Sequence, residues 1–181
     1  MTPSQAIKLV ADIFETTEAD VEIFDRRLQE AGLRTSTGGR GVSTDDVIRL
    51  TLAALIVKRP ARTALMISEW WALPLVSDKL KRSEKAVLPP KLRVAIDNVT
   101  LGEALNALLQ DCVDANLDSI EFDVELIPHD KRAYLKLSDG KTETVLTFGG
   151  RLDADEPRER FSTTHLIYQD AFVELAEALR G

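Results

Sequence analysis

Residues 8–57 read KLVADIFETTEADVEIFDRRLQEAGLRTSTGGRGVSTDDVIRLTLAALIV, and this stretch decides the fold that we expect for the first half of the chain. Apolar residues at helical spacing predict a first helix over Pro3–Glu15. A second helix is predicted over Glu18–Ala31, where apolar residues recur at i, i+3, i+7 and i+10 and form one stripe. The corner between the two helices holds Thr16 and Thr17, whose hydroxyls can accept hydrogen bonds from the free N–H groups of the second helix.

A glycine-rich loop and a third helix complete this stretch. Gly32 is the natural left-handed stop for the second helix. Residues 34–42 contain three glycines and no apolar period, which predicts a hairpin tip or a flexible loop. Ser43 and Asp46 have the spacing of a capping box, so we expect a third helix from Ser43 to about Lys58.

The middle of the chain predicts one more helix and then a linker. The helix covers about Ala61–Ala72 and carries Trp70 and Trp71. Because adjacent residues cannot share one helix face, we expect one tryptophan in the core and the other at a subunit contact. Between Ser77 and Pro90 the composition becomes basic and polar, as is typical of a linker.

The second half of the chain predicts helices around a small sheet. A short strand is expected over Leu92–Ile96, and a capping box at Thr100 and Glu103 opens a helix that runs to about Asn116. Apolar and polar residues then alternate in three segments, which predicts a three-stranded antiparallel meander. The segments are 120–126, 133–137 and 142–148.

The end of the meander and the last helix have their own signals. Asp139-Gly140 is a strong hairpin signal between the second and third strands. A last helix is expected after a cap at Thr163 or Thr164, and two helices would then cover one face of the sheet.

The charge of −7 is unevenly divided. Residues 1–96 carry 15 Lys and Arg against 12 Asp and Glu, a net charge of +3, whereas residues 97–181 carry 8 against 18, a net charge of −10. Two basic stretches lie in the first part, Arg26–Arg62 and Lys79–Arg93. Binding to phosphate requires local positive potential, so only the first half is expected to present a basic face.

Short sequence motifs along the first half follow the order helix, turn, helix, glycine loop and capped helix. They are Val10-Ala11-Asp12-Ile13-Phe14, Val21, Arg26-Arg27-Leu28, Glu30-Ala31-Gly32-Leu33, Gly38-Gly39-Arg40-Gly41, and Ser43-Thr44-Asp45-Asp46-Val47 with Arg49-Leu50. This order resembles the MerR and excisionase branch of winged helix-turn-helix domains, and it is similar to small prophage-type proteins that carry the same AGL and GGRG words.

Together with the helix, strand and linker patterns along the rest of the chain, the resemblance predicts a fold class and a domain division. The class is α+β, with a helical winged helix-turn-helix-like lobe followed by a lobe of one three-stranded antiparallel sheet and two helices. The expected division is a first lobe over residues 1–76, a basic linker over 77–91, and an acidic lobe over 92–181 that dimerises or senses a signal.

The resemblance also implies contacts with double-stranded DNA, because in such domains the second helix enters the major groove and the wing follows the backbone or the minor groove. Arg26 would face bases or phosphates, Arg27 and Arg34 would clamp phosphate, and Arg40 would be the contact at the tip of the wing. The hydroxyls at the start of the helix would bind phosphate. The implied contact residues are Thr16, Thr17, Arg26, Arg27, Arg34 and Arg40.

The second helix departs from this family pattern because four carboxylates crowd the half that ought to meet DNA. They are Glu18, Asp20, Glu22 and Asp25. Glu22 also stands four residues before Arg26, a spacing at which the two side chains pair on a solvated face. The competing interpretation is therefore a three-helix interaction module that binds no nucleic acid.

The sequence contains no motif that indicates catalysis or the binding of a cofactor or a metal. It lacks a nucleophile elbow, a phosphate-cradling Gly-Lys-Ser/Thr loop and a Cys–His pair at recognisable spacing. Cys112, His129 and His165 would need a coincidence of fold to form a zinc site. A single cysteine fits a reducing cytoplasm, and no apolar run reaches the roughly 20 residues of a membrane span.

The leading hypothesis is a cytoplasmic, non-enzymatic DNA-binding protein, a transcription regulator of the phage or prophage type that acts as a homodimer. The acidic second lobe would contact another protein or dimerise. The alternative is a phage packaging or assembly module, or an acidic inhibitor that mimics DNA, which would form a stable homo-oligomer and would not bind DNA.

Overall fold

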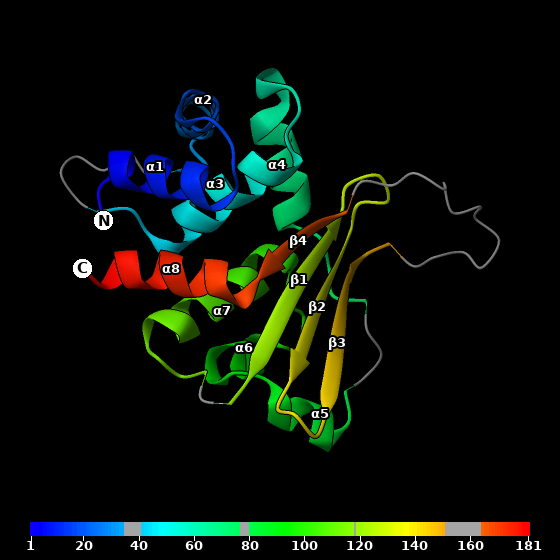
Figure 1. Ribbon diagram of the computed structural model, residues 1–181. Helices are drawn as coiled ribbons and strands as arrows, with labels where there is room; N and C mark the ends of the chain where they lie inside the picture. Colours follow the sequence, from blue (N-terminus) through cyan, green and yellow to red (C-terminus); the bar gives the residue numbers. More distant parts are fainter. Residues whose placement is uncertain (35–40, 77–79, 118, 151–163) are drawn as a thin grey trace.

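The computed structural model describes residues 1–34, 41–76, 80–117, 119–150 and 164–181. Its helices are α1 (Pro3–Ile13), α2 (Glu18–Glu30), α3 (Thr44–Ile56), the short 3₁₀ helix η1 (Pro60–Arg62), α4 (Thr63–Trp71), α5 (Arg82–Val87), α6 (Pro90–Ala95), α7 (Leu101–Val113) and α8 (Gln169–Arg180). Its strands are β1 (Glu121–Ile127), β2 (Arg132–Ser138), β3 (Glu143–Gly149) and β4 (His165–Tyr168). The class is α+β, with most helices before the sheet (Figure 1).

The N-terminal helices begin at side-chain caps. Thr17 Oγ1 accepts a hydrogen bond from the backbone N–H of Asp20 at 3.1 Å and caps α2. Ser43 Oγ and the Asp46 carboxylate exchange hydrogen bonds with each other's backbone N–H, which confirms the capping box predicted for α3. α1, α2 and α3 pack against one another, so the three-helix arrangement of the first half is confirmed.

The two tryptophans have different surroundings. Trp70 is buried in the core, as expected for one of the pair. The Trp71 ring lies 4.2 Å from the Arg49 guanidinium carbon and also rests on α7 at Gly102, where any Cβ atom would overlap the indole. Trp71 thus joins α3 and α4 to α7, and the predicted subunit contact stays a prediction.

The predicted strand over Leu92–Ile96 is wrong, because this segment lies in α6 and its end. Pro90 occupies the first turn of α6, where its missing N–H costs nothing. The buried Asp111 carboxylate accepts a hydrogen bond from the backbone N–H of Lys91 at 3.0 Å. α5 also lies inside the segment predicted as a linker, and its end is anchored by the buried side chains of Val87 and Leu88.

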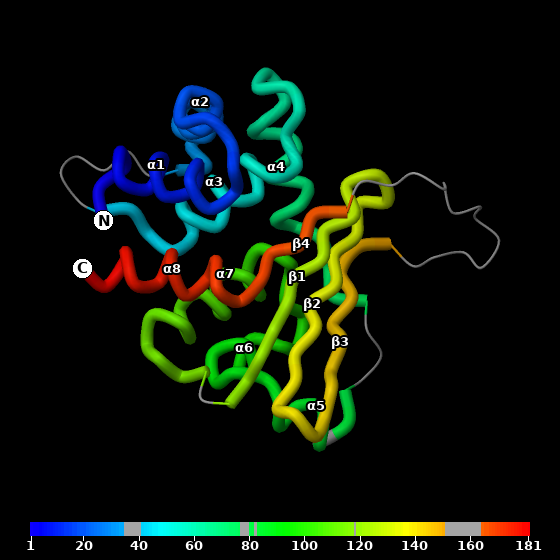
Figure 2. Tube along the Cα trace, in the orientation of Figure 1, coloured from blue at the N-terminus to red at the C-terminus, as the bar shows by residue number. Residues whose placement is uncertain are grey.

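The sheet has four strands, not three, in the antiparallel order β3-β2-β1-β4 (Figure 2). The predicted meander forms β1, β2 and β3. The fourth strand, β4, covers residues that were expected to open the last helix, and it pairs with β1 through Val124 and Ile167. The predicted Asp139-Gly140 hairpin is confirmed, because Asp139 Oδ1 accepts from the backbone N–H groups of Lys141 and Thr142.

One face of the sheet is buried against helices. Phe122 of β1 meets Phe172 of α8 edge to face, with ring centroids 5.1 Å apart. Residues 74–76 lie along the outer edge of β3, where the backbone N–H of Val76 donates to the carbonyl of Thr147 and Leu75 forms a bridge with Phe148. The buried apolar side chains form one cluster that includes both halves of the chain.

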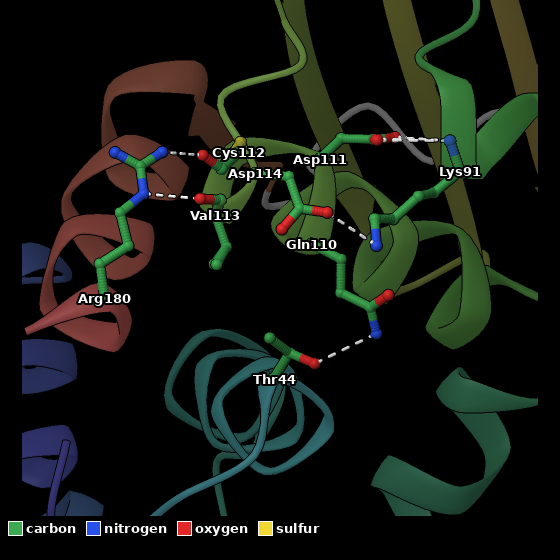
Figure 3. A network of polar contacts seen from close by, with 8 residues as sticks. All are labelled: Thr44, Lys91, Gln110, Asp111, Cys112, Val113, Asp114 and Arg180. Atoms are coloured by element: carbon green, nitrogen blue, oxygen red, sulfur yellow. Dashed lines mark hydrogen bonds and ion pairs between the residues drawn. The ribbon is translucent and has the colours of Figure 1, made fainter.

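The C-terminal end of α7 fastens three other helices (Figure 3). Gln110 donates a hydrogen bond to Thr44 of α3, and Asp114 forms an ion pair with Lys91 of α6 at 2.8 Å. The guanidinium of Arg180 in α8 donates to the carbonyl oxygens of Cys112 and Val113. These last carbonyls of α7 have no partner within their own helix, so Arg180 acts as a side-chain cap.

Candidate functional site

The threonines predicted to contact phosphate lie at the start of α2. Thr17 is exposed, but its hydroxyl is already engaged, because it caps the helix and donates to the Asp20 carboxylate at 2.7 Å. Thr16 is partly buried, and its backbone N–H donates to the carbonyl of Ala11.

The two arginines within α2 point to solvent. Arg27 forms an ion pair with Glu30 at 2.7 Å, and about half of each side chain is exposed. Arg26 is also exposed, and no ion pair joins it to another residue in the described part of the chain. Arg26 is therefore the member of the predicted set that is best placed to meet a partner.

Arg34 lies in the interior, with only 2% of its side chain exposed. Its guanidinium forms an ion pair with the buried carboxylate of Asp25. Burial raises the pKa of Asp25 above its ordinary value, against the opposing attraction of Arg34 and the hydrogen bond from Gln29. The position of Arg34 leaves no surface at which phosphate could reach it, so its role here is to stabilise the end of α2.

Arg40, the predicted contact at the tip of the wing, lies outside the described residues, as do its neighbours over 35–40. The base of that loop is held from α3, because Arg49 Nη1 donates to the carbonyl of Leu33 at 2.6 Å. The structure therefore does not bring Arg26, Arg34 and Arg40 together on one surface within the part that it describes.

Acids and bases alternate around α2. Four carboxylates on α2 are exposed: Glu18, Asp20, Glu22 and Glu30. η1 packs on α2, and the corner from α3 to α4 adds three exposed cations, namely Lys58, Arg59 and Arg62. These cations belong to the basic stretch Arg26–Arg62, but no local pattern in the sequence distinguishes them, because only the fold brings the corner to α2.

The second basic stretch is largely engaged in local contacts. Arg93 donates to the carbonyl oxygens of Ala86 and Leu88, which closes the corner between α5 and α6. Lys85 pairs with Asp97 at 3.4 Å, and Lys91 pairs with Asp114. These partners reduce the positive potential that the stretch offers to a phosphate backbone.

A second candidate surface is the face of the sheet that no described helix covers. The described elements cover the face of Phe122, Val124 and Leu126 but leave side chains of the opposite face accessible. We call this second surface the open sheet face. Its residues are Glu121, Asp123, Glu125, Tyr134, Lys136, Ser138, Glu143, Val145, Thr147, Leu166 and Tyr168.

The open sheet face holds large apolar side chains in contact with solvent. Val145 is 40% exposed, Leu166 is 46% exposed and Tyr168 is 57% exposed. These are three of the six large apolar residues exposed in the described part of the chain, the others being Leu65, Val94 and Val173. A hollow of about 460 Å³ lies beside Tyr168, at the start of α8.

A second hollow, of about 640 Å³, lies between the helices. It is lined by Asp45, Trp71, Pro90, Lys91, Val94, Ala95, Glu103, Asn106, Ala107 and Gln110. Val94 on its rim is 89% exposed, and the side-chain oxygen of Asn106 is buried without a hydrogen-bond partner.

The residues considered as metal ligands, Cys112, His129 and His165, do not form one site. Cys112 is buried, and desolvation raises the pKa of its thiol to about 12, with a further contribution from Asp111. Burial and the nearby Lys58 lower the pKa of His165. Among the described residues no three His, Cys, Asp or Glu side chains are arranged to hold a metal ion.

Comparison of the chain with protein-family models, with curated proteins and with solved structures finds no match. Within the described residues, no helix is long and apolar enough to cross a membrane.

Proposed function

We propose that the chain is a non-enzymatic protein-interaction module that binds another protein through its open sheet face. The observation that carries this proposal is that Leu166 and Tyr168 lie together on β4, with Val145 across the same face on β3, where no described helix covers them. Exposed apolar side chains that lie together, with polar residues around them, are typical of protein-binding surfaces. Tyrosine in particular combines a large apolar area with a polar tip that can find a partner at an interface.

The contacts around α2 also support this proposal over binding to DNA. A DNA-reading helix needs cations that are free to displace counterions. Arg34 is buried against Asp25, and Arg27 is paired with Glu30. The exposed carboxylates of α2 would repel phosphate at the surface where the helix would meet the groove.

A photo-crosslinking experiment tests the proposal in the organism that encodes the chain. A benzoylphenylalanine is introduced in place of Tyr168 and, as a control of similar chemistry, in place of Val173, which is 37% exposed on α8. We expect discrete protein adducts from position 168 that are missing from position 173. Identical adducts from both positions, or none from position 168, would contradict binding at this face.

A second candidate function, binding to duplex DNA as a dimer, is favoured by one observation. Arg26 is exposed on α2, and η1, with Arg59 and Arg62 beside it, packs on the same helix. This candidate predicts affinity for a mixed-sequence duplex at low ionic strength, measured by fluorescence anisotropy, and a clear loss of it in Arg26→Ala. The protein-interaction proposal predicts no measurable affinity for the duplex in either protein.

A further inference from the structure

Resting on the proposed function, we infer that the open sheet face binds an extended basic segment of another protein that carries cations and apolar side chains on one side, two residues apart. The sheet register places Leu166 and Tyr168 on the β4 edge of the face, Val145 on the β3 edge, and the carboxylates of Asp123 and Glu125 on β1 between them. One row across the four strands runs Val145, Lys136, Asp123, Tyr168. The next row runs Thr147, Tyr134, Glu125, Leu166.

This pattern fits an extended segment better than a flat apolar partner. Neighbouring strands are about 4.8 Å apart, so a chain that crosses the sheet along a row meets apolar and charged groups in turn. Every second side chain of an extended segment points the same way, so a cation and an apolar residue that stand two positions apart can meet an acid and either Tyr168 or Val145 on the same face. The hollow of about 460 Å³ adds room for one large side chain beside Tyr168.

The negative charge of the open sheet face indicates that its partner carries positive charge. Carboxylates around this face and its hollow are Glu121, Asp123, Glu125, Glu143 and Asp170. Among its described side chains that are exposed, Lys136 is the single cation, and Glu125 already pairs with it at 3.1 Å. Arg132, at the end of the same face, is buried and donates to the carbonyl of Gly150.

The same charge count argues against a second copy of the chain on this face. Two such faces brought together would oppose carboxylates to carboxylates in a partly desolvated interface, which is costly. A basic segment would instead pair with carboxylates such as Asp123 and Glu143, which form no ion pair with another described residue, since Lys136 pairs with Glu125.

The test uses the full chain and three synthetic peptides of equal length with glycine at every second position. The positions between are lysine and leucine in turn, lysine and serine in turn, or glutamate and leucine in turn, so that both residues of each pair share one side of the extended chain. Binding is measured by calorimetry, and the contact residues are mapped by amide chemical shifts. We expect the lysine–leucine peptide to bind more tightly than the lysine–serine peptide, the glutamate–leucine peptide not to bind, and shifts to concentrate on β1, β2 and β4.

Matched variants separate this surface from general attraction to an acidic protein. Tyr168→Ser combined with Asp123→Asn should weaken binding of the lysine–leucine peptide by about tenfold or more. The control, Val173→Ser combined with Glu174→Gln, removes the same charge and a similar exposed apolar group from α8 and should change binding by less than about twofold.

Three results would overturn the inference. They are an equal loss of affinity in both double variants, shifts concentrated on α2, and self-association of the chain that Tyr168→Ser abolishes, since this last result would assign the face to a second copy. If this inference fails while protein adducts still form from position 168, the proposed function stands with a partner of other chemistry. If those adducts are also missing, the proposed function fails too.

Discussion

The solvent side of α2 and the open sheet face both carry several charged side chains, but they differ in what accompanies the charges. On α2 the charged groups serve the helix itself: Asp20 takes part in the N-terminal cap, and Arg27 pairs with Glu30 one turn away. On the sheet, Val145 and Tyr168 stand in solvent beside several carboxylates, of which only Glu125 forms an ion pair, with Lys136, among the described residues. Charges that are satisfied locally stabilise an element, whereas apolar groups left exposed on a regular face indicate a surface for a partner.

The largest effect is expected where this comparison assigns a structural role to a residue that the sequence suggested for DNA. Arg34→Met leaves the Asp25 carboxylate buried without its cation, and we expect the free energy of unfolding to fall by about 3–5 kcal/mol. Urea denaturation measures the change. A loss below about 1 kcal/mol would contradict the structural role and would return Arg34 to the set of surface contacts.

A smaller effect should come from the apolar side chains of the sheet. Leu166→Ser with Tyr168→Ser removes groups that are already half exposed, so we expect unfolding to become easier by no more than about 1 kcal/mol. The same variant should lose the protein adduct formed from a crosslinker placed at Val145. A stability loss comparable to that of Arg34→Met would mean that these side chains support the fold and are not kept for a partner.

Two carboxyl groups, the buried one of Asp25 on α2 and the one of Asp139 in the hairpin between β2 and β3, should contribute to the pH dependence of stability with opposite signs. Burial raises the pKa of Asp25, so the folded state holds this proton more tightly than the unfolded state does, and the contribution of Asp25 to stability falls as pH rises from its ordinary pKa of 3.8 through the raised value. Hydrogen bonds from Thr142 and Lys141 lower the pKa of Asp139 at the end of the sheet, so its contribution is present above 3.8 and is lost as pH falls through the lowered value. Carboxyl carbon-13 titration of the folded protein should place the pKa of Asp25 above that of Asp139, and the reverse order would contradict both assignments.

The smallest effect is expected from the ion pair on the surface of α2. Because Arg27 and Glu30 are each about half exposed, Arg27→Ala should change the free energy of unfolding by less than about 0.5 kcal/mol in urea denaturation. Glu30→Ala serves as the reciprocal control. A loss above about 1 kcal/mol in both variants would show that the solvated side of α2 contributes to stability more than its geometry indicates.

The parts of the fold that could be predicted from the sequence are those that depend on neighbours in the chain. Thr17, Ser43 and Thr100 begin their helices through hydrogen bonds to residues three positions ahead, and Asp139 shapes its hairpin in the same way. Such contacts are visible as spacing, so α2, α3, α7 and the hairpin were predicted at the correct places.

The predictions that are wrong concern segments whose structure depends on contacts with residues far away in the sequence. His165–Tyr168 has an apolar content that suits a helix or a strand, and only pairing with β1 makes it a strand. Leu92–Ile96 alternates like a strand, but Pro90 and the Asp111 carboxylate fix the start of a helix there. The pair of Arg34 with Asp25 spans nine residues and a turn at Gly32, so no local pattern could predict that Arg34 is buried.

The open sheet face also depends on contacts between segments that are far apart in the sequence. The sequence predicted the alternation of apolar and acidic residues in β1, but it could not show that β4 adds Leu166 and Tyr168 to the acidic side of the sheet. The alternation within β1 alone predicts only a half-buried strand with acids on its other side, and it carries no sign of the apolar side chains that β4 places beside those acids. The strand that was not predicted is the strand that supplies the most exposed apolar side chain of the open sheet face.

The measurement that tests the central claim most directly is hydroxyl-radical footprinting of the chain inside the cells that produce it, compared with the purified protein. If the open sheet face is the binding surface, Tyr168 and Leu166 should be protected in cells, while residues on α2 around Arg26 should be modified equally in both samples. Protection around Arg26 with no protection of Tyr168 would contradict the claim and would assign the binding surface to α2.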